Sequence, residues 1–427
     1  MKNPLRLLLA AVLFAVLAAI AGNGSITAAA GGPSNGAGTF RVLAPIESGH
    51  LLLFPVVRVS GESPAETPFI TLDEGLKSGE IEVTEAGNVR GLVRPRPANG
   101  QHGSQIYTPP SGNQNRGDQV NTLVLVNHSK KPLLLLAGEI VTGGKQDRVI
   151  AKDRIVLPDA DPIDLSVFCI EPGRWTGNSD NFGVSNKTSA ESFMVQPSVR
   201  VNAMATHDQQ QVWNSVHGAI SQMAVAAAPG PPTTVGSASE TVTVNPSDVA
   251  GTLNTTSYAQ AMNNGAIRAE VDKAAAPANE VRAEVLDKLR AEHAVGVVVA
   301  VHGKLIWADV FADTDLLSRY WTKLVRSYAA ESVTDTGDHE APGVADAQRF
   351  LESAATGHET SEGDMGVYRY SELHGEGTET FILESLLPST NYDVHISKMK
   401  LRDGGDRAWR EAPPSPRPNF IPIEPIR

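Results

Sequence analysis

Cysteine is nearly absent from this sequence, since Cys169 is the only one in 427 residues. A single cysteine excludes an internal disulfide and a zinc site built from several thiolates. Its position also excludes a lipoprotein, whose lipid would be carried by a cysteine directly after an export signal. Apolar neighbours, Val167, Phe168 and Ile170, predict that Cys169 is a buried, inert side chain rather than a reactive thiol.

Basic residues are in the minority. The chain has 36 Lys and Arg against 48 Asp and Glu, a formal net charge of −12. A nucleic-acid-binding protein needs a basic face that neutralises phosphates, so we expect no nucleic-acid partner. Aromatic residues make up only 5% of the chain, but hydrophobic residues reach 41%, which is enough for a sizeable core. The length predicts one large domain or two moderate ones.

The usual sequence signatures of catalysis are missing. The single Gly-x-Ser-x-Gly string, Gly32–Gly36, has no strand before it and no helix after it, which disfavours an α/β-hydrolase. The sequence contains no Gly-x-x-x-x-Gly-Lys-Ser/Thr phosphate loop, no strand-to-helix Gly-x-Gly-x-x-Gly and no His-Glu-x-x-His. The 11 histidines lack metal-ligand spacing. We therefore expect no dedicated metal site and no cofactor.

The N-terminal residues have the pattern of an export signal. Lys2 and Arg6 precede an apolar run, Leu7–Ile20, whose 14 residues are too few to span a membrane comfortably. We predict a signal peptide over residues 1–30, cleaved after Ala21 or Ala30, and a flexible linker over residues 31–39. The expected location is the periplasm or the exterior, with no stable membrane insertion after cleavage. An uncleaved membrane anchor is the alternative.

The remaining sequence predicts an α+β fold, a β-rich domain over residues 40–400 with mixed or antiparallel sheets. The apolar run Leu133–Leu136 indicates a sheet that is covered on both faces. Residues 176–293 are rich in Asn, Ser and Ala and predict a helical, partly flexible insertion. A proline-rich tail follows over residues 401–427. No repeat of 20 to 50 residues is present, which disfavours a solenoid or a propeller.

Local patterns predict individual elements within this domain. Thr71 and Glu74 form a capping-box pattern that opens a short helix. Strands are predicted over Thr122–Asn127 and Lys131–Ile140, joined as a hairpin by three residues. A second hairpin over 295–308 turns at His302-Gly303, where His302 is expected to be a turn residue.

A longer helix is predicted over residues 314–329. Its apolar side chains are expected to face inward, and Arg319, Lys323 and Arg326 are expected to face solvent.

One group of polar residues lies near two strand ends and carries the candidate chemistry. Glu139 interrupts an apolar strand, where a carboxylate is unfavourable unless it is paired, and Arg148 or Arg174 is the expected partner. Glu139 with a raised pKa would suit a general acid or base. Glycines in the turn would let a ligand approach the backbone, and the basic residues would hold an anionic group. The predicted ligand-binding residues are Lys145, Arg148, Glu171, Arg174 and Trp175.

The same residues are also compatible with a structural role. Ion pairs would then lock the glycine turn onto the sheet, because structural networks also perturb carboxylates. In that interpretation Trp175 fills the core and Glu171 caps the turn that follows it. Both interpretations stay open at the level of sequence.

Several stretches occur together in and after this group. They are Leu134–Glu139, Gly143–Arg148, Cys169–Trp175, the hairpin Val297–Lys304, Asp309–Phe311, the helix with Trp321 and Tyr328, and the strand around His395. Together they resemble the ARPP family, named for ARG and rhodanese-phosphatase-superfamily-associated protein. The family name implies a gene association with ADP-ribosylglycohydrolases and phosphatase-like proteins, and through it nucleotide or ADP-ribose-related ligands.

Three functional hypotheses follow. The first is a binding module in which Glu139, Lys145, Arg148 and Arg174 hold a small anionic ligand or a cell-envelope protein. The second is a hydrolase of phosphate- or nucleotide-containing small molecules, with Glu139 as general acid or base. The third is a structural cell-envelope protein that presents its helical insertion to a partner.

Overall fold

The structure is a computed structural model. It describes residues 40–59, 67–89, 93, 122–174, 179–185, 192–227, 255–279, 282–337, 339–353, 359–375, 377–388 and 390–401. All of these residues belong to one compact unit, 35–427. The predicted signal peptide, the linker, nearly all of the tail and Trp175 lie outside the described residues.

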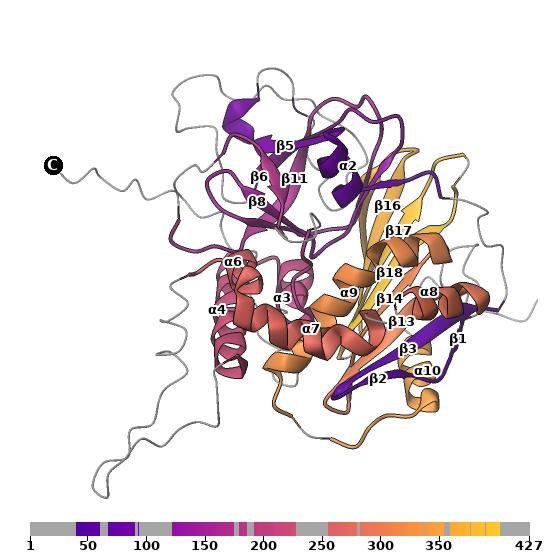
Figure 1. Cartoon of the computed structure of the whole chain (residues 1–427). Coiled ribbons are helices and arrows are strands. Elements are labelled where there is room, and N and C mark those ends of the chain that lie inside the picture. Colours follow the sequence, from indigo (N-terminus) through magenta and orange to yellow (C-terminus); the bar gives the residue numbers. More distant parts are fainter. Residues whose placement is uncertain are drawn as a thin grey trace, which may run out of the picture. The chain divides into compact units, whose positions relative to one another are not determined.

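The largest sheet is antiparallel throughout and has nine strands (Figure 1). Eight of them follow the order β1-β3-β13-β14-β18-β17-β16-β15, and β2 pairs with β3. Their bounds are β1 (Phe40–Val42), β2 (Ile46–Ser48), β3 (Leu51–Arg58), β13 (Ala294–Val301), β14 (Lys304–Phe311), β15 (Glu359–Asp364), β16 (Tyr368–His374), β17 (Thr378–Ser385) and β18 (Asp393–Lys400). The chain therefore has the α+β fold that its sequence predicts.

Both faces of this sheet are covered where β13 lies. Val297 and Val299 belong to the main core, whereas Val298 and Ala300 belong to a second core that Phe350 of α10 (Val344–Glu352) joins from the other face. Alternate residues of a strand point to opposite faces, so burial of both faces explains the continuous run of β-branched residues. The predicted hairpin is confirmed, and His302 is a turn residue with φ 49°.

The central helix of the main core is α9 (Thr314–Thr334), which contacts β13 and α7 (Gly265–Asn279) (Figure 1). The side chain of Asp313 caps it by accepting a hydrogen bond from Leu316 N at 2.8 Å. The apolar side chains predicted to face inward are buried: Leu317, Trp321, Leu324, Val325 and Tyr328. The helix runs one turn further than its sequence pattern predicts.

Helices between residues 197 and 291 contribute to the same core as α9. Val212, Tyr258 and Val271 are buried in it. The elements are α3 (Pro197–Val201), the π-helix η2 (Asn202–Thr206), α4 (Gln209–Ala226), α6 (Tyr258–Asn263), α7 and α8 (Arg282–Ala291). Within their described parts, these helices therefore pack as an integral layer of the domain.

Two smaller sheets enclose a further core. One has the order β12-β8-β9-β11-β6-β5 and the other the order β10-β7-β4, in which β4 runs parallel to β7. Their bounds are β4 (Ile70–Thr71), β5 (Ile81–Glu85), β6 (Thr122–Asn127), β7 (Leu133–Leu135), β8 (Ile140–Gly143), β9 (Arg148–Ile150), β10 (Arg154–Val156), β11 (Ile163–Cys169) and β12 (Phe182–Val184). Leu133 and Leu135 face this core and Leu134 faces the main core, which confirms the two-sided burial predicted here.

The shorter helical elements of this region follow their local sequence. The capping box of Thr71 and Glu74 is formed, and it opens α2 (Leu72–Ser78) as predicted. Gly79 ends α2 in the left-handed conformation with φ 75°. A 3-10 helix, η1 (Ala86–Asn88), follows β5.

The hairpin predicted from Thr122 to Ile140 is wrong. β6 and β7 belong to different sheets, and the second predicted strand is interrupted by a turn at Leu136–Glu139. The Asn127 side chain donates to Lys131 O at 2.9 Å and to Val156 O at 3.0 Å. These two bonds hold the segment between β6 and β7 in a conformation other than a tight hairpin turn. Gly138 adopts φ 96°, and a Cβ there would come within 2.9 Å of Arg200 Cδ.

Candidate functional site

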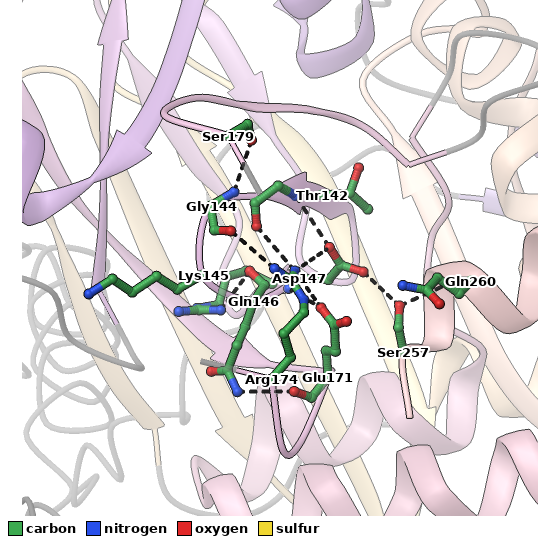
Figure 2. Close-up of polar contacts among 12 residues, drawn as sticks. Thr142, Gly144, Lys145, Gln146, Asp147, Glu171, Arg174, Ser179, Ser257 and Gln260 are labelled. Atoms are coloured by element: carbon green, nitrogen blue, oxygen red, sulfur yellow. Dashed lines mark hydrogen bonds and ion pairs between the residues drawn. The ribbon is translucent and has the colours of Figure 1, made fainter. Parts of the chain in front are cut away.

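The structure divides the predicted site residues between two places. Lys145, Glu171 and Arg174 lie around the turn between β8 and β9, residues 143–147, here called the Gly143 loop (Figure 2). Arg148 directly follows this loop as the first residue of β9. Glu139 lies in the main core instead, beside α9. Trp175 is outside the described residues.

The Gly143 loop depends on its two glycines. Gly143 and Gly144 have φ 132° and 50°, and a Cβ on Gly144 would lie 2.3 Å from Phe182 Cζ. Side chains then accept from the backbone N–H groups of the loop: Ser179 Oγ at 3.2 Å from Gly144 N, and Glu85 Oε1 at 2.9 Å from Lys145 N. These contacts stabilise the conformation of the loop seen here.

Arg174 ties the loop to the end of β11. Its guanidinium lies 2.6 Å from Glu171 Oε2 and 3.5 Å from Asp147 Oδ1. It also donates to Gly144 O at 3.1 Å. The side chain is 19% exposed, so part of it reaches the surface. This is a charge-assisted, multiply bonded contact of the kind that arginine geometry favours.

The Arg148 side chain is completely buried. Its Nη1 donates to Gln146 O at 2.6 Å, and its Nη2 lies 3.8 Å from Glu85 Oε1. The side chain has no exposed area, and burial lowers the pKa of the guanidinium. Contact between Arg148 and a ligand would require the loop to open.

Asp147 and Glu171 form a pair of neighbouring carboxylates. Burial raises the pKa of Asp147, and the Glu171 carboxylate raises it further. The Ser257 hydroxyl, which donates to Asp147 Oδ2 at 2.6 Å, partly offsets that rise. Glu171 Oε2 in turn accepts from Asp147 N at 3.0 Å. A carboxyl in this setting retains its proton to higher pH than an exposed aspartate does.

Lys145 is half-buried on the same loop. Its side chain points away from Asp147, Glu171 and Arg174, whereas those three converge (Figure 2). Lys145 therefore lies at the edge of the loop, whereas Asp147, Glu171 and Arg174 converge at its centre.

Glu139 has a different partner from the two that its sequence context predicts. Its Oε1 lies 2.6 Å from Lys323 Nζ, and its Oε2 accepts from Leu136 N at 2.8 Å. The expected pairing with Arg148 or Arg174 is therefore wrong. The turn at Gly138 separates Glu139 from β7 and leaves it directly before β8, and its side chain lies in the core beside α9.

Lys323 also contacts the Asp73 carboxylate, so it stands between two acids. Burial acts to lower the pKa of Lys323, but the Asp73 and Glu139 carboxylates outweigh burial and raise it. Burial raises the pKa of Glu139, and the Lys323 ammonium opposes this. The result is a buried ion pair rather than an exposed general acid or base.

The prediction that Arg319, Lys323 and Arg326 face solvent is wrong. Their side chains are 19%, 3% and 15% exposed. The reason is that α2 and α7 pack against this side of α9 and supply acids: Glu74 lies 2.9 Å from Arg319, and Asp272 lies 3.0 Å from Arg326. In the sequence, the acidic first turn of α2, with Asp73 and Glu74, indicates a possible partner for these cations.

A second buried polar network escaped the sequence reasoning. His395 Nδ1 lies 2.6 Å from Asp153 Oδ2, and its Nε2 lies 3.2 Å from Asp309 Oδ1. Arg200 binds the same Asp309 carboxylate at 2.9 and 3.2 Å, and Tyr328 donates to it. Burial acts to lower the pKa of His395, but the two carboxylates raise it to about 9. The sequence feature that could have indicated this network is a polar residue within an otherwise apolar strand, as for Asp309 in β14.

A comparison with family models decides the identity of the domain. The model described as the ARG and Rhodanese-Phosphatase-superfamily-associated Protein domain, ARPP-1, matches residues 39–399. The chain belongs to the ARPP-1 family. The resemblance inferred from the sequence is thereby confirmed, and the Gly143 loop and both buried networks lie within the ARPP-1 domain. No curated protein and no solved structure matches the chain.

The described residues of this ARPP-1 domain lack two features. Within them, no helix has the length and apolar character to cross a membrane. In the same part of the chain, no three His, Cys, Asp or Glu side chains are grouped so that they could hold a metal ion. Cys169 is buried, as predicted, and burial raises the pKa of its thiol.

Proposed function

We propose that this ARPP-1 domain is a binding module that holds a small anionic ligand at the Gly143 loop. The main observation is that two of its cations, Arg174 and Lys145, are more exposed than its acids. The carboxylates of Glu85, Asp147 and Glu171 are only 4%, 7% and 4% exposed, whereas the Arg174 side chain is 19% exposed. With Lys145 at the loop edge, an approaching ligand meets positive charge.

The rigidity of the loop supports this proposal. Arg174 joins two carboxylates and the Gly144 carbonyl, so the loop is ordered before any ligand arrives. Preorganised groups bind more tightly because less conformational entropy is lost on binding. Glu139, the general acid or base suggested by the sequence, lies outside this loop and is paired with Lys323, which supports binding over turnover by Glu139.

A hydrolase is the second candidate, and one observation favours it. The raised pKa of Asp147 beside Glu171 gives a carboxyl group that suits general acid or base work, in the role that the sequence assigned to Glu139. A phosphate- or nucleotide-containing small molecule such as ADP-ribose is the substrate class that the family name suggests. The proposed setting for either function is the periplasm or the cell exterior.

A thermal-shift titration tests the binding proposal. The purified protein is titrated with inorganic phosphate, ADP-ribose and a cell-envelope sugar phosphate. A ligand at about a hundred times its dissociation constant stabilises by about 2.7 kcal/mol. Lys145→Ala should remove this shift, whereas Lys288→Ala, which removes an exposed lysine of α8, should leave it intact.

The possible results separate the two candidates. A shift that survives Lys145→Ala, or the absence of a shift with all three compounds, contradicts the binding proposal. Hydrolysis of ADP-ribose by the wild-type protein that is lost in Asp147→Asn, with folding retained, would establish the hydrolase instead.

A further inference from the structure

An open groove lies away from the Gly143 loop, between α2, the turn before β7 and the start of α9. Its volume is about 490 Å³, within the usual range for sites that bind small ligands. Phe69 and Ile70 contribute to its lining, with Glu74 and Arg319 on one side and Lys130 and Lys131 on another.

The α2–α9 side of the groove is held in place by Arg319. The guanidinium donates to Phe69 O at 2.6 Å and to Glu74 Oε2 at 2.9 Å, and it lies 3.5 Å from Asp315 Oδ2. Two acids share this one cation, and their side chains are 47% and 65% exposed. The rim on this side therefore carries a net negative charge that faces solvent.

A second ion pair, between Lys323 and Asp73, also joins α9 to α2. One turn further along α9, Lys323 binds Asp73, the residue that precedes Glu74 in α2. Arg319 and Lys323 thus each join α9 to α2. Two such contacts from successive turns hold the two helices at a constant separation, so the groove is already formed without a ligand.

The opposite side of the groove carries Lys130 and Lys131 and one acid, Glu80, whose backbone O accepts from His128 N at 2.8 Å, so its net charge is positive. Lys130 and Lys131 are exposed, and neither forms an ion pair with any residue that the structure describes. Their turn is fixed by Ser129, whose N–H donates to Asn127 Oδ1 at 3.0 Å and whose hydroxyl donates to Lys131 O at 2.8 Å. The lysines therefore extend from a rigid support.

We propose that this groove binds a short peptide segment that carries one acidic and one basic side chain. The acidic side chain would face Lys130 and Lys131, and the basic one would face Glu74 and Asp315. A nucleotide or a sugar phosphate brings only negative charge to the groove and would meet the acidic rim. A polyamine brings only positive charge and would meet the lysines. Only a dipolar ligand complements both sides.

Titration calorimetry with two capped tetrapeptides tests the proposal. Acetyl-Glu-Gly-Gly-Lys-amide should bind at least about tenfold more tightly than acetyl-Gln-Gly-Gly-Gln-amide. The double variant K130A/K131A should weaken binding of the charged peptide by about tenfold or more. The matched control K77A/K288A removes two exposed lysines that do not line the groove and should bind as the wild type does.

Each contrary result overturns the proposal. Equal affinity for the two peptides, no binding of either, or unchanged affinity in K130A/K131A would show that the groove does not select a dipolar peptide. Phosphate that binds as tightly as the charged peptide would make the groove an anion site instead. Lys145→Ala must leave peptide binding unchanged, so the outcome is independent of the ligand proposed for the Gly143 loop.

Discussion

Lys323 Nζ lies 2.6 Å from Glu139 Oε1, although the two residues are 184 positions apart in the chain. Both side chains are almost completely buried, and Asp73 adds a second carboxylate to the lysine. The pair joins the turn before β8 to the middle of α9. Removal of one charge from a buried pair leaves the other without compensation.

The first prediction concerns this pair. Lys323→Met should lower the free energy of unfolding by about 3 to 5 kcal/mol, because Asp73 and Glu139 would remain buried without a cation. Urea denaturation at neutral pH measures the loss. Lys288→Met, on the exposed side of α8, is the control and should change stability by less than about 0.5 kcal/mol.

A double variant separates the charge effect from packing. Glu139→Gln in the Lys323→Met background should recover part of the lost stability, since one of the two uncompensated carboxylates is then neutral. If the double variant is less stable than Lys323→Met alone, the loss comes from packing and the ion-pair interpretation is wrong.

The second prediction is a loss of stability at alkaline pH. The pKa of His395 is raised from 6.5 to about 9 by Asp153 and Asp309, against the effect of burial. Because the folded-state pKa is raised, the protonated His395 stabilises the fold. This stabilisation is complete below pH 6.5 and is lost as the pH rises through 9. The total is about 3 kcal/mol, since one pKa unit corresponds to about 1.4 kcal/mol.

Urea denaturation between about pH 6 and pH 10 measures this contribution. His395→Gln should be less stable than the wild type at pH 6, and the difference should shrink toward pH 10. Arg200, Asp309 and Tyr328 also face this site, but their charges stay constant over most of the interval. A difference independent of pH would contradict the assignment of the effect to His395.

The third prediction is a loss of stability at acidic pH. Burial acts to raise the pKa of Glu372, but His207 and Lys152 lower it from 4.5 to about 2. A lowered folded-state pKa contributes stability that is present above pH 4.5 and lost as the pH falls toward 2. Glu372→Gln should remove this part of the acid dependence. If wild type and variant lose stability in parallel over that interval, Glu372 is not its source.

The fourth prediction concerns the Gly143 loop. Gly144→Ala should destabilise the protein by about 1 to 3 kcal/mol or more, because the new methyl group would lie 2.3 Å from Phe182 Cζ in a positive-φ conformation. Gly183→Ala is the matched control, since a Cβ there meets nothing within 4 Å and φ is not positive. Thermal unfolding of both variants provides the measurement. Equal stability would show that the loop tolerates a side chain at position 144.

Local chemistry was sufficient for much of the fold. The capping box at Thr71 opens α2, and His302-Gly303 turns the β13–β14 hairpin, because caps and tight turns depend on a few adjacent residues. The apolar stripe of α9 and the two-sided burial at Leu133–Leu136 follow from periodicity alone. The stretches that resemble the ARPP family also identified the domain correctly.

The failures share one cause, which is that they concern contacts distant in sequence. The positions of Arg319 and Lys323 on α9 are typical of a solvated face, and only the packing of α2 against α9 buries them. The partner of Glu139 could not be read from its neighbours, because Lys323 is 184 positions away and reaches it only when α9 packs into the core. Both errors concern charges whose partners come from another element.

The sequence by itself determined the family, the fold class and four residues that gather at the Gly143 loop, Lys145, Arg148, Glu171 and Arg174, because these depend on composition, periodicity and short motifs. Tertiary structure decided which charges are paired and which reach the surface. It placed Glu139 with Lys323, and His395 with Asp153 and Asp309, while Lys130 and Lys131 remained exposed. The physical reason is that ion pairing depends on distance in space, and elements far apart in the chain set that distance only when they pack.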